Sequence, residues 1–304
     1  MFCNILCIHP TYAYKDKKMK KTFLLLWVSL CTFFTISAQD LKSSTLWKID
    51  GKGLEQASYL FGTIHLTCDA SLDDKIIIAL EETDQLVMEL DMDDPEMQMQ
   101  MMEQMFMKNG EKVSRLISED DYELLDEFLS KELGMGLASI EQMKPFFIQA
   151  SLFPKLLNCP MQSYELELMK ATKTQNEEIY GLESLQEQMK VFDDIPYEDQ
   201  LKDLIQMAKD NMEHSKQMMT TMMELYDDEN IQALLELIND DRYSAMSEHQ
   251  DLLLSERNKK WIHKIESFAK DKPTFFGVGA GHLAGENGVI TLLRKKGYRV
   301  TAVR

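Results

Sequence analysis

The stretch TFFGVGAGHLAGENGVITLLRKKGYRVTAV, residues 274–303, holds strand, turn, helix and strand signals in that order. Thr274–Val278 is an apolar run typical of a buried strand, and the turn GAGH follows at residues 279–282. Asn287–Lys296 has the apolar spacing of a helix that stops before a glycine, and Tyr298–Val303 predicts a second strand. The stretch therefore predicts a βαβ unit with a G-x-x-H motif after its first strand.

The same order occurs near the other end of the chain. Ser58–Phe61 predicts a short strand, GTIH follows at residues 62–65, Ser71–Thr83 predicts a helix, and Gln85–Leu90 predicts a strand. Two βαβ units require a largely parallel sheet with helices over it. We therefore expect an α/β (or α+β) fold whose mixed, largely parallel sheet is built from both chain ends.

Between these units, at about residues 95–265, strand signals nearly vanish. Ser139–Gln142 and Ser184–Glu187 have the form of capping boxes that open helices. Helical apolar spacing continues through Tyr197–Tyr226 and Tyr243–Phe268, and Glu178–Leu182 is an isolated strand candidate. We expect a helical insertion that packs over the sheet.

The paired G-x-x-H motifs indicate a metal site. A residue just beyond the carboxyl end of a parallel strand points into the crevice where such sheets bind ligands. His65 and His282 could hold one metal ion there, since imidazole suits Zn, Mn, Fe or Co. Glu89, near the end of the strand after the first motif, could add an oxygen ligand or act as a general base. The alternatives are two surface histidines in ordinary turns and a solvated glutamate on a strand.

The N-terminal sequence predicts the compartment. The basic pair Lys20-Lys21 precedes the apolar run Phe23–Phe34, an order typical of a secretory signal peptide, which we place at residues 1–38. The mature domain would then span residues 39–304, outside the cytoplasm in the periplasm or secreted, with no stable membrane span. An uncleaved membrane anchor is the alternative, and Met19 is an alternative start.

Charge excludes one large class of partners. Lys and Arg together number 33 against 51 Asp and Glu, which gives a net charge of −18. Nucleic-acid binders must neutralise phosphates with dense basic side chains. We therefore expect no nucleic-acid partner.

Two sulfur-containing residue types leave alternatives open. Cys68 and Cys159 are the cysteines after the signal segment, and they form either one disulfide or two buried thiols that never meet. The chain has 22 methionines, concentrated at Met88–Met107 and Met207–Met223. We favour helical core filling for them, against an adaptable peptide-binding surface or soft Cu(I) ligands.

Several strings of the sequence resemble the TraB/GumN family, which includes the Tiki peptidases. They are YLFGTIH, LVMELD, YGLESLQEQM, LLSERN and GVGAGHLAGENGVITLLRKKGYRV, in the family's order. The family is marked by two G-x-x-H motifs with a Glu and an Arg, which correspond here to Glu89 and Arg257. The resemblance implies a divalent metal ion, with Mn or Co favoured over Zn or Fe, held by His65, His282 and Glu89.

The resemblance also gives roles to residues that composition alone would leave on the surface. Arg257 would hold a substrate carboxylate or stabilise an oxyanion through its planar fork. Glu183 and Gln188 match the family's G-L-E and E-Q positions, and Glu183 would support the site from outside the metal ligands, its alternative role being helix capping beside Ser184.

Two functions follow as hypotheses. The first is an extracytoplasmic metal-dependent hydrolase, a Tiki-like peptidase acting on peptides or proteins, with Glu89, Arg257 and Glu183 as catalytic residues. The second is a non-catalytic protein of the pheromone-shutdown type that binds and sequesters peptides. It would carry a structural metal or none. The metal site requires the two motif histidines to meet, and it fails if they lie more than about 8 Å apart, beyond the reach of two metal–nitrogen bonds of about 2.1 Å. The oligomeric state is left open.

Overall fold

The computed structural model describes residues 43–240 and 245–304. The predicted signal peptide at residues 1–38 lies outside the described residues, as does Tyr243. Within the described part, no helix has the length and apolar character needed to cross a membrane.

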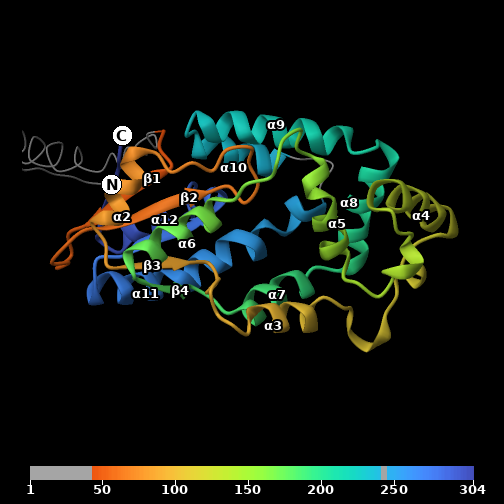
Figure 1. Cartoon of the computed structure of the whole chain (residues 1–304), viewed down its shortest axis with the longest axis horizontal. Coiled ribbons are helices and arrows are strands. Elements are labelled where there is room, and N and C mark those ends of the chain that lie inside the picture. The colour runs from red at the N-terminus through yellow and green to blue at the C-terminus, as the bar shows by residue number, and fades with distance from the viewer. Residues whose placement is uncertain (1–42, 241–244) are drawn as a thin grey trace, which may run out of the picture. The chain divides into compact units, whose positions relative to one another are not determined.

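A six-stranded sheet organises the described chain, in the order β4-β3-β5-β2-β1-β6 (Figure 1). Its strands are β1 (Leu46–Asp50), β2 (Ser58–Thr63), β3 (Gln85–Met88), β4 (Glu178–Gly181), β5 (Phe275–Gly279) and β6 (Arg299–Ala302). β1 is antiparallel to both of its neighbours, and the other pairs are parallel. The sheet is therefore mixed and largely parallel, as predicted.

Both predicted βαβ units are present, and they interleave. The first runs from β2 through α2 (Asp74–Glu81) to β3, and the second from β5 through α12 (Val289–Lys295) to β6. β5 lies between β2 and β3, so the C-terminal unit inserts its first strand into the N-terminal unit. β4, predicted as an isolated strand, adds to the sheet beside β3.

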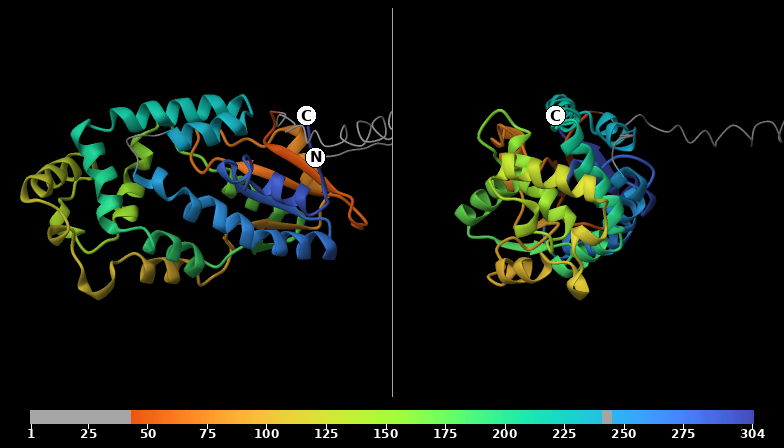
Figure 2. Two further views of the ribbon diagram at one scale, coloured as in Figure 1. Left: turned by 180° about the vertical axis from the view of Figure 1, so that it is seen from behind. Right: turned by 90° about the vertical axis from the view of Figure 1, so that its right-hand side faces the viewer.

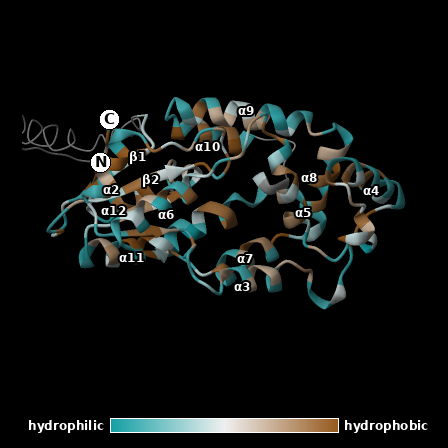
Figure 3. Ribbon diagram, in the orientation of Figure 1, coloured by the Kyte–Doolittle hydropathy of each residue, from teal (hydrophilic) through white to brown (hydrophobic). Residues whose placement is uncertain are grey.

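Helices cover both faces of the sheet, because successive strand residues point to opposite sides. On one face, Leu86 and Phe275 pack with α2 and with α6 (Tyr164–Gln175). On the other, Val87 and Phe276 pack with a larger set: α9 (Glu213–Asp227), α10 (Ile231–Asp240), α11 (Glu256–Asp271) and α12. Figure 2 shows the helices on the two sides, and Figure 3 shows apolar residues concentrated on the strands.

The predicted helical insertion forms a second core of its own. Its remaining helices are α3 (Met97–Gln104), α4 (Glu119–Leu133), α5 (Pro145–Leu152), α7 (Leu185–Asp193) and α8 (Tyr197–Lys209). Leu125, Ile148 and Leu204 of α4, α5 and α8 are fully buried together. The insertion is therefore more than a cover for the sheet, and it has apolar contacts that stabilise it internally.

One of the two predicted capping boxes is wrong. At Ser184 the side chain accepts from the Glu187 N–H and the Glu187 side chain accepts from the Ser184 N–H, which confirms the box that opens α7. Ser139 instead ends a 3₁₀ turn, and the helix begins at Pro145. Proline opens helices readily, since its missing N–H would be unpaired in the first turn anyway.

The predicted core filling by the methionines is confirmed in part. Met88, Met107, Met207 and Met212 are buried in the apolar cores. No residue of α3 is buried, and Met99 and Met102 are 57% and 65% exposed. In α9 only Tyr226 is buried, while Met222 and Met223 pack partly against the sheet core. Core filling therefore describes part of the methionine set, and none of the methionines of α3 is buried.

The disulfide alternative for the two cysteines is confirmed. Cys68 is bonded to Cys159, with Cα atoms 5.6 Å apart. Beside it, Thr67 and Gln162 form a β-bridge, and the Gln162 side chain donates to Cys68 O at 3.0 Å. The segment after the first G-x-x-H motif is thus fastened to the segment that leads into α6.

Opening this disulfide should destabilise the protein substantially. The bond closes a loop of 91 residues, for which chain entropy gives about 4 kcal/mol of stabilisation. We expect Cys68→Ser/Cys159→Ser to lower the free energy of unfolding by roughly that amount in urea titrations. Addition of reductant should shift the wild-type midpoint equally and leave the double variant unchanged. A reductant-insensitive wild type would contradict the bond.

Candidate functional site

Three neighbouring parallel strands end at the same edge of the sheet. β5 is flanked by β2 and β3, with Thr63 opposite Gly279 and Met88 opposite Gly277. His65, Glu89 and His282 each follow closely after one of these strands. The sheet therefore brings the three predicted residues to one place, as expected for carboxyl strand ends.

The glycines of the two motifs allow this close approach. A β-carbon on Gly279 would lie 3.3 Å from Glu89 Oε1, 3.5 Å from His65 Nε2 and 3.6 Å from His282 Cδ2. A β-carbon on Gly62 would lie 2.6 Å from Leu283 Cδ1 and 3.1 Å from Ala280 Cα, so the Leu283 side chain would have to move. Both imidazoles thus lie within 3.6 Å of one point, so they are nearer to each other than the 8 Å limit, and the predicted convergence is confirmed.

Glu89 lies at the centre of the cluster and is buried, with 9% of the residue exposed. Its Oε1 accepts from the Gly279 N–H at 2.8 Å, and its Oε2 accepts from Arg257 Nη2 at 2.6 Å and Gln188 Nε2 at 3.2 Å. Burial alone would raise its pKa, but Arg257, His65 and the Gly279 N–H hold the pKa of Glu89 down at about 2. Glu89 is therefore a fixed anion and not a solvated strand residue.

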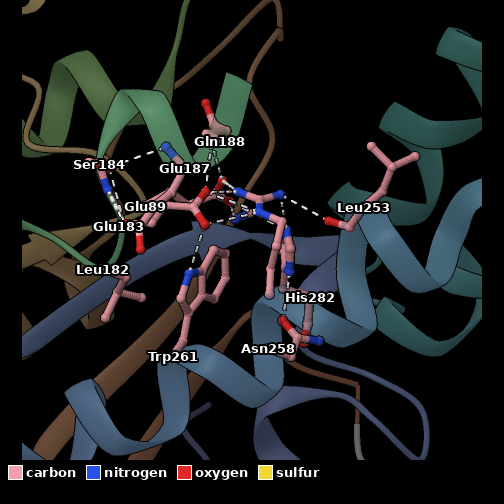
Figure 4. Close-up of polar contacts among 12 residues, drawn as sticks. Glu89, Leu182, Glu183, Ser184, Glu187, Gln188, Leu253, Asn258, Trp261 and His282 are labelled. Atoms are coloured by element: carbon pink, nitrogen blue, oxygen red, sulfur yellow. Dashed lines mark hydrogen bonds and ion pairs between the residues drawn. The ribbon is translucent and has the colours of Figure 1, made fainter. Parts of the chain in front are cut away.

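His282 is held in one tautomer by Asn258 (Figure 4). Asn258 Nδ2 donates to the carbonyls of His282 and Asn287, so its Oδ1 must accept from His282 Nδ1, at 2.7 Å. Burial lowers the pKa of His282 to about 3, which keeps the ring neutral. Its Nε2 lone pair then faces Arg257 Nη1 at 3.1 Å. His282 is only 4% exposed, so its ring is largely buried in the protein interior although it borders the crevice.

His65 is oriented by a residue of the helical insertion. Glu165, on α6, lies 2.8 Å from His65 Nδ1, and its carboxylate also accepts from Thr63 Oγ1 at 2.7 Å and Ser163 Oγ at 2.6 Å. The His65 side chain is 67% exposed. Crowding by protein atoms lowers its pKa, but the Glu165 carboxylate outweighs this and raises the pKa of His65 to about 9.

Arg257, on α11, is buried and uses all five of its N–H groups within the protein. Nε and Nη2 donate to Glu183, Nη2 donates to Glu89, and Nη1 contacts Leu253 O at 3.0 Å and His282 Nε2. Glu183 also accepts from Trp261 Nε1 at 3.2 Å. With these contacts in place, Arg257 positions Glu89 and Glu183 and has no N–H free for a substrate carboxylate, the first role predicted for it.

Sequence reasoning found Glu89, Glu183 and Arg257 but missed Glu165 and Asn258. Asn258 directly follows Arg257 in LLSERN, so it was within a recognised string. Glu165 lies in a helix a hundred residues from its partner, and no local pattern connects the two. Only the folded arrangement shows that each histidine has its own oxygen partner at Nδ1.

The side-chain types and orientations of His65, His282 and Glu89 fit a divalent ion. Within residues 43–240 and 245–304, no three His, Cys, Asp or Glu side chains already stand at metal-ligand spacing. However, His282 Nε2 is 3.7 Å from Glu89 Oε1, and His65 Nε2 faces the same space above Gly279. Both rings use Nδ1 for an oxygen partner, the usual support of metal-bound histidine, which leaves Nε2 for the ion. If Arg257 Nη1 moved away from His282 Nε2, small shifts would bring the two Nε2 atoms and Glu89 Oε1 together around one ion.

Two cavities open at this cluster and share His65, Glu89 and Arg257. One has a volume of about 450 Å³ and reaches α5 and α7, and the other has about 250 Å³ and reaches α9 and α10. Both linings are mainly apolar around the shared polar residues. This arrangement is typical of ligand-binding sites, in which few polar groups fix orientation.

Comparison with known proteins gives one match. The chain matches the model of the TraB/PrgY/gumN family over residues 45–302, which includes both G-x-x-H motifs and all residues of the cluster. No curated protein and no solved structure matches it.

Proposed function

The chain belongs to the TraB/PrgY/gumN family, and from this premise we propose that it is an extracytoplasmic, divalent-metal-dependent hydrolase that acts on peptides or proteins. The observation that carries the proposal is the meeting of His65, His282 and Glu89 around Gly279. Two nitrogen donors and one carboxylate oxygen form a donor set that Zn, Mn, Fe and Co accept.

His65, His282 and Glu89 would hold the ion, which supplies Lewis-acid polarisation of a carbonyl and an acidified water. The chain's own residues prepare the site. Asn258 and Glu165 keep the two Nδ1 atoms occupied, so that Nε2 of each ring is directed to the cluster. Arg257 keeps Glu89 anionic and fixed, and Glu89 and His282 are both buried. The low pKa of Glu89 suits a ligand better than a general base, which works best near neutral pH.

Two features support the proposed extracytoplasmic location. The sequence of residues 1–38 has the form of a signal peptide, and the Cys68–Cys159 disulfide is of a kind that persists in oxidising compartments. N-terminal sequencing of the purified mature protein should begin near Gln39.

Metal analysis with peptide turnover tests the proposal. The purified chain should retain about one divalent ion, hydrolyse members of a peptide library, lose that activity in EDTA, and regain it with Mn²⁺ or Co²⁺. A protein that binds no divalent ion and cleaves no peptide would contradict the proposal.

That outcome would favour the second candidate, a peptide-binding protein without catalysis. The observation on its side is that Arg257 and Glu89 already satisfy each other, so that the cluster is stable as an ion-pair network. Such a protein would bind peptides in EDTA as tightly as with metal.

Glu165 provides a prediction specific to the metal. Glu165→Gln weakens the charged partner of His65 Nδ1, and loss of an outer partner typically costs 10–100-fold in metal affinity or activity. We expect the dissociation constant for Mn²⁺, measured by competition with a fluorescent chelator, to rise by about that factor. Ser163→Ala, which removes a hydrogen bond to the other oxygen of Glu165, is the matched control and should have a much smaller effect. Equal effects would indicate general loosening of the loop.

A further inference from the structure

We propose that the two cavities are paired apolar subsites that take the side chains on either side of one peptide bond, within an internal segment of an extended polypeptide. The inference deepens the proposed function and rests on it for the position of the reacting bond. It names the substrate class: a chain bearing two consecutive bulky apolar residues, recognised without either terminus.

The cavities extend from the shared cluster toward different parts of the insertion. The larger is bounded by α3, α5 and α7, and the smaller by α9, α10 and the π-helical turn Asp251–Ser255. Figures 1 and 2 both draw α9 and α10 along one border of the described chain and α3 and α7 along the opposite border. A ligand at the cluster therefore has one cavity on each side of it.

Apolar side chains dominate both linings. The larger cavity is lined by Met92, Met101, Phe146, Phe147, Met189 and Phe192. The smaller is lined by Ile64, Met222, Leu234, Ile238, Leu253 and Leu254. The Phe146 and Phe192 rings stack at 3.9 Å, which gives the larger cavity a rigid aromatic wall. The methionines of the lining are flexible and can adapt to different apolar side chains.

Apart from His65, the charged side chains that line the two cavities are already paired within the protein. Among the lining residues of these two cavities, Arg257 is the only Lys or Arg, and its five N–H groups are used within the protein. The acids Glu89 and Glu165 are likewise held by their own partners. A free ammonium group would therefore be desolvated there without a partner, which is costly, and a free carboxylate would find only the His65 imidazole.

Chain geometry then fixes the relation between the two side chains. In an extended segment, successive side chains point to opposite sides. A peptide bond at the cluster thus directs the residue before it into one cavity and the residue after it into the other. Two adjacent apolar residues satisfy both cavities at once.

Equilibrium binding in EDTA tests this without requiring turnover. The probe is a fluorescently labelled octapeptide with both termini blocked, made of Gly, Ser and Ala around a central Phe-Leu pair, and its affinity is measured by anisotropy. Replacing Phe or Leu of the pair by Ser should weaken binding about ten- to a hundredfold each, the range expected for burying one large apolar side chain. A free-terminus tetrapeptide with the same pair should gain nothing.

Variants in each cavity test which residue of the peptide pair that cavity binds. Phe192→Ser should abolish the discrimination between apolar residue and Ser at one position of the pair, and Met222→Ser should abolish it at the other position. Circular dichroism and thermal melting check the fold, and Met92→Ser, at a residue 37% exposed, replaces Phe192→Ser if α7 is disturbed.

The outcomes separate the two proposals. Position-specific discrimination without hydrolysis in any metal would support the paired subsites and contradict the hydrolase. Equal binding of the Phe-Leu and Ser-Ser peptides, loss at both positions from a single variant, or tighter binding of free termini would overturn the paired subsites, whatever the turnover.

Discussion

The His65→Ala variant is expected to lose its divalent ion and all measurable peptide hydrolysis while it folds as the wild type does. Removing a ligand should exceed the 10–100-fold cost of losing an outer partner, so activity should fall by more than about a hundredfold. The side chain is 67% exposed, and Glu165 keeps its bonds to Thr63 and Ser163 without the ring. The loss should therefore appear in metal content and kcat, and hardly in the urea midpoint.

His263→Ala is the matched control, because it removes an exposed imidazole from the same protein, on α11. It should bind metal and cleave peptides as the wild type does. His282→Ala should also lose the ion, but this ring is buried, lies 4.5 Å from the Trp261 ring and is bonded to Asn258, so a loss of stability is expected as well. Full activity in His65→Ala would exclude it as a ligand and, with it, the proposed site.

The sequence predicted the βαβ units because their signals are local. Each strand, G-x-x-H turn and helix lies within about thirty residues, and apolar periodicity reports such elements well. The interleaving could not be predicted in this way, because β5 enters between β2 and β3 through pairings more than 200 residues apart, such as Phe61 with Gly277. β1 was also missed, and it is defined by its antiparallel pairing with β2 and β6.

The candidate site was likewise predictable only where its signals are local. His65, Glu89 and His282 could be predicted because each follows a strand end, and strand ends in a parallel sheet meet. The Nδ1 partners of the histidines could not, since Glu165 comes from α6 and Asn258 from α11, and a polar residue on an amphipathic helix looks solvated until the fold places it. The methionines were predicted only in part, because helical spacing does not distinguish a buried core position from a half-buried one.

Arg257→Met is expected to produce the largest loss of stability of any single substitution in the cluster. Arg257 is 7% exposed and lies between the buried carboxylates of Glu89 and Glu183, with both N···O distances at 2.6 Å. Methionine fills similar space but leaves two buried anions without their cation, and breaking a buried pair in this way costs about 3–5 kcal/mol. Urea titration followed by circular dichroism measures the loss.

Arg299→Met is the control, because Arg299 also pairs with a carboxylate, that of Asp50, yet its side chain is 71% exposed. An exposed pair contributes about 1 kcal/mol or less, so this variant should barely shift the midpoint. Arg257→Lys should fall between the two, since it keeps the charge but loses the planar fork that reaches both acids.

A double variant tests whether the loss of stability in Arg257→Met comes from the buried carboxylates. In the wild type, Glu183→Gln removes an anion that Arg257 and Trp261 hold in place, so it should destabilise the protein. In the Arg257→Met background the same change removes one of two unpaired buried anions, so it should stabilise the protein instead. Such a change of sign is a coupling that contacting residues can show and independent ones cannot. If Glu183→Gln costs the same in both backgrounds, the arginine acts through packing on Trp261, whose ring lies 4.8 Å from its guanidinium carbon, and not through the two carboxylates.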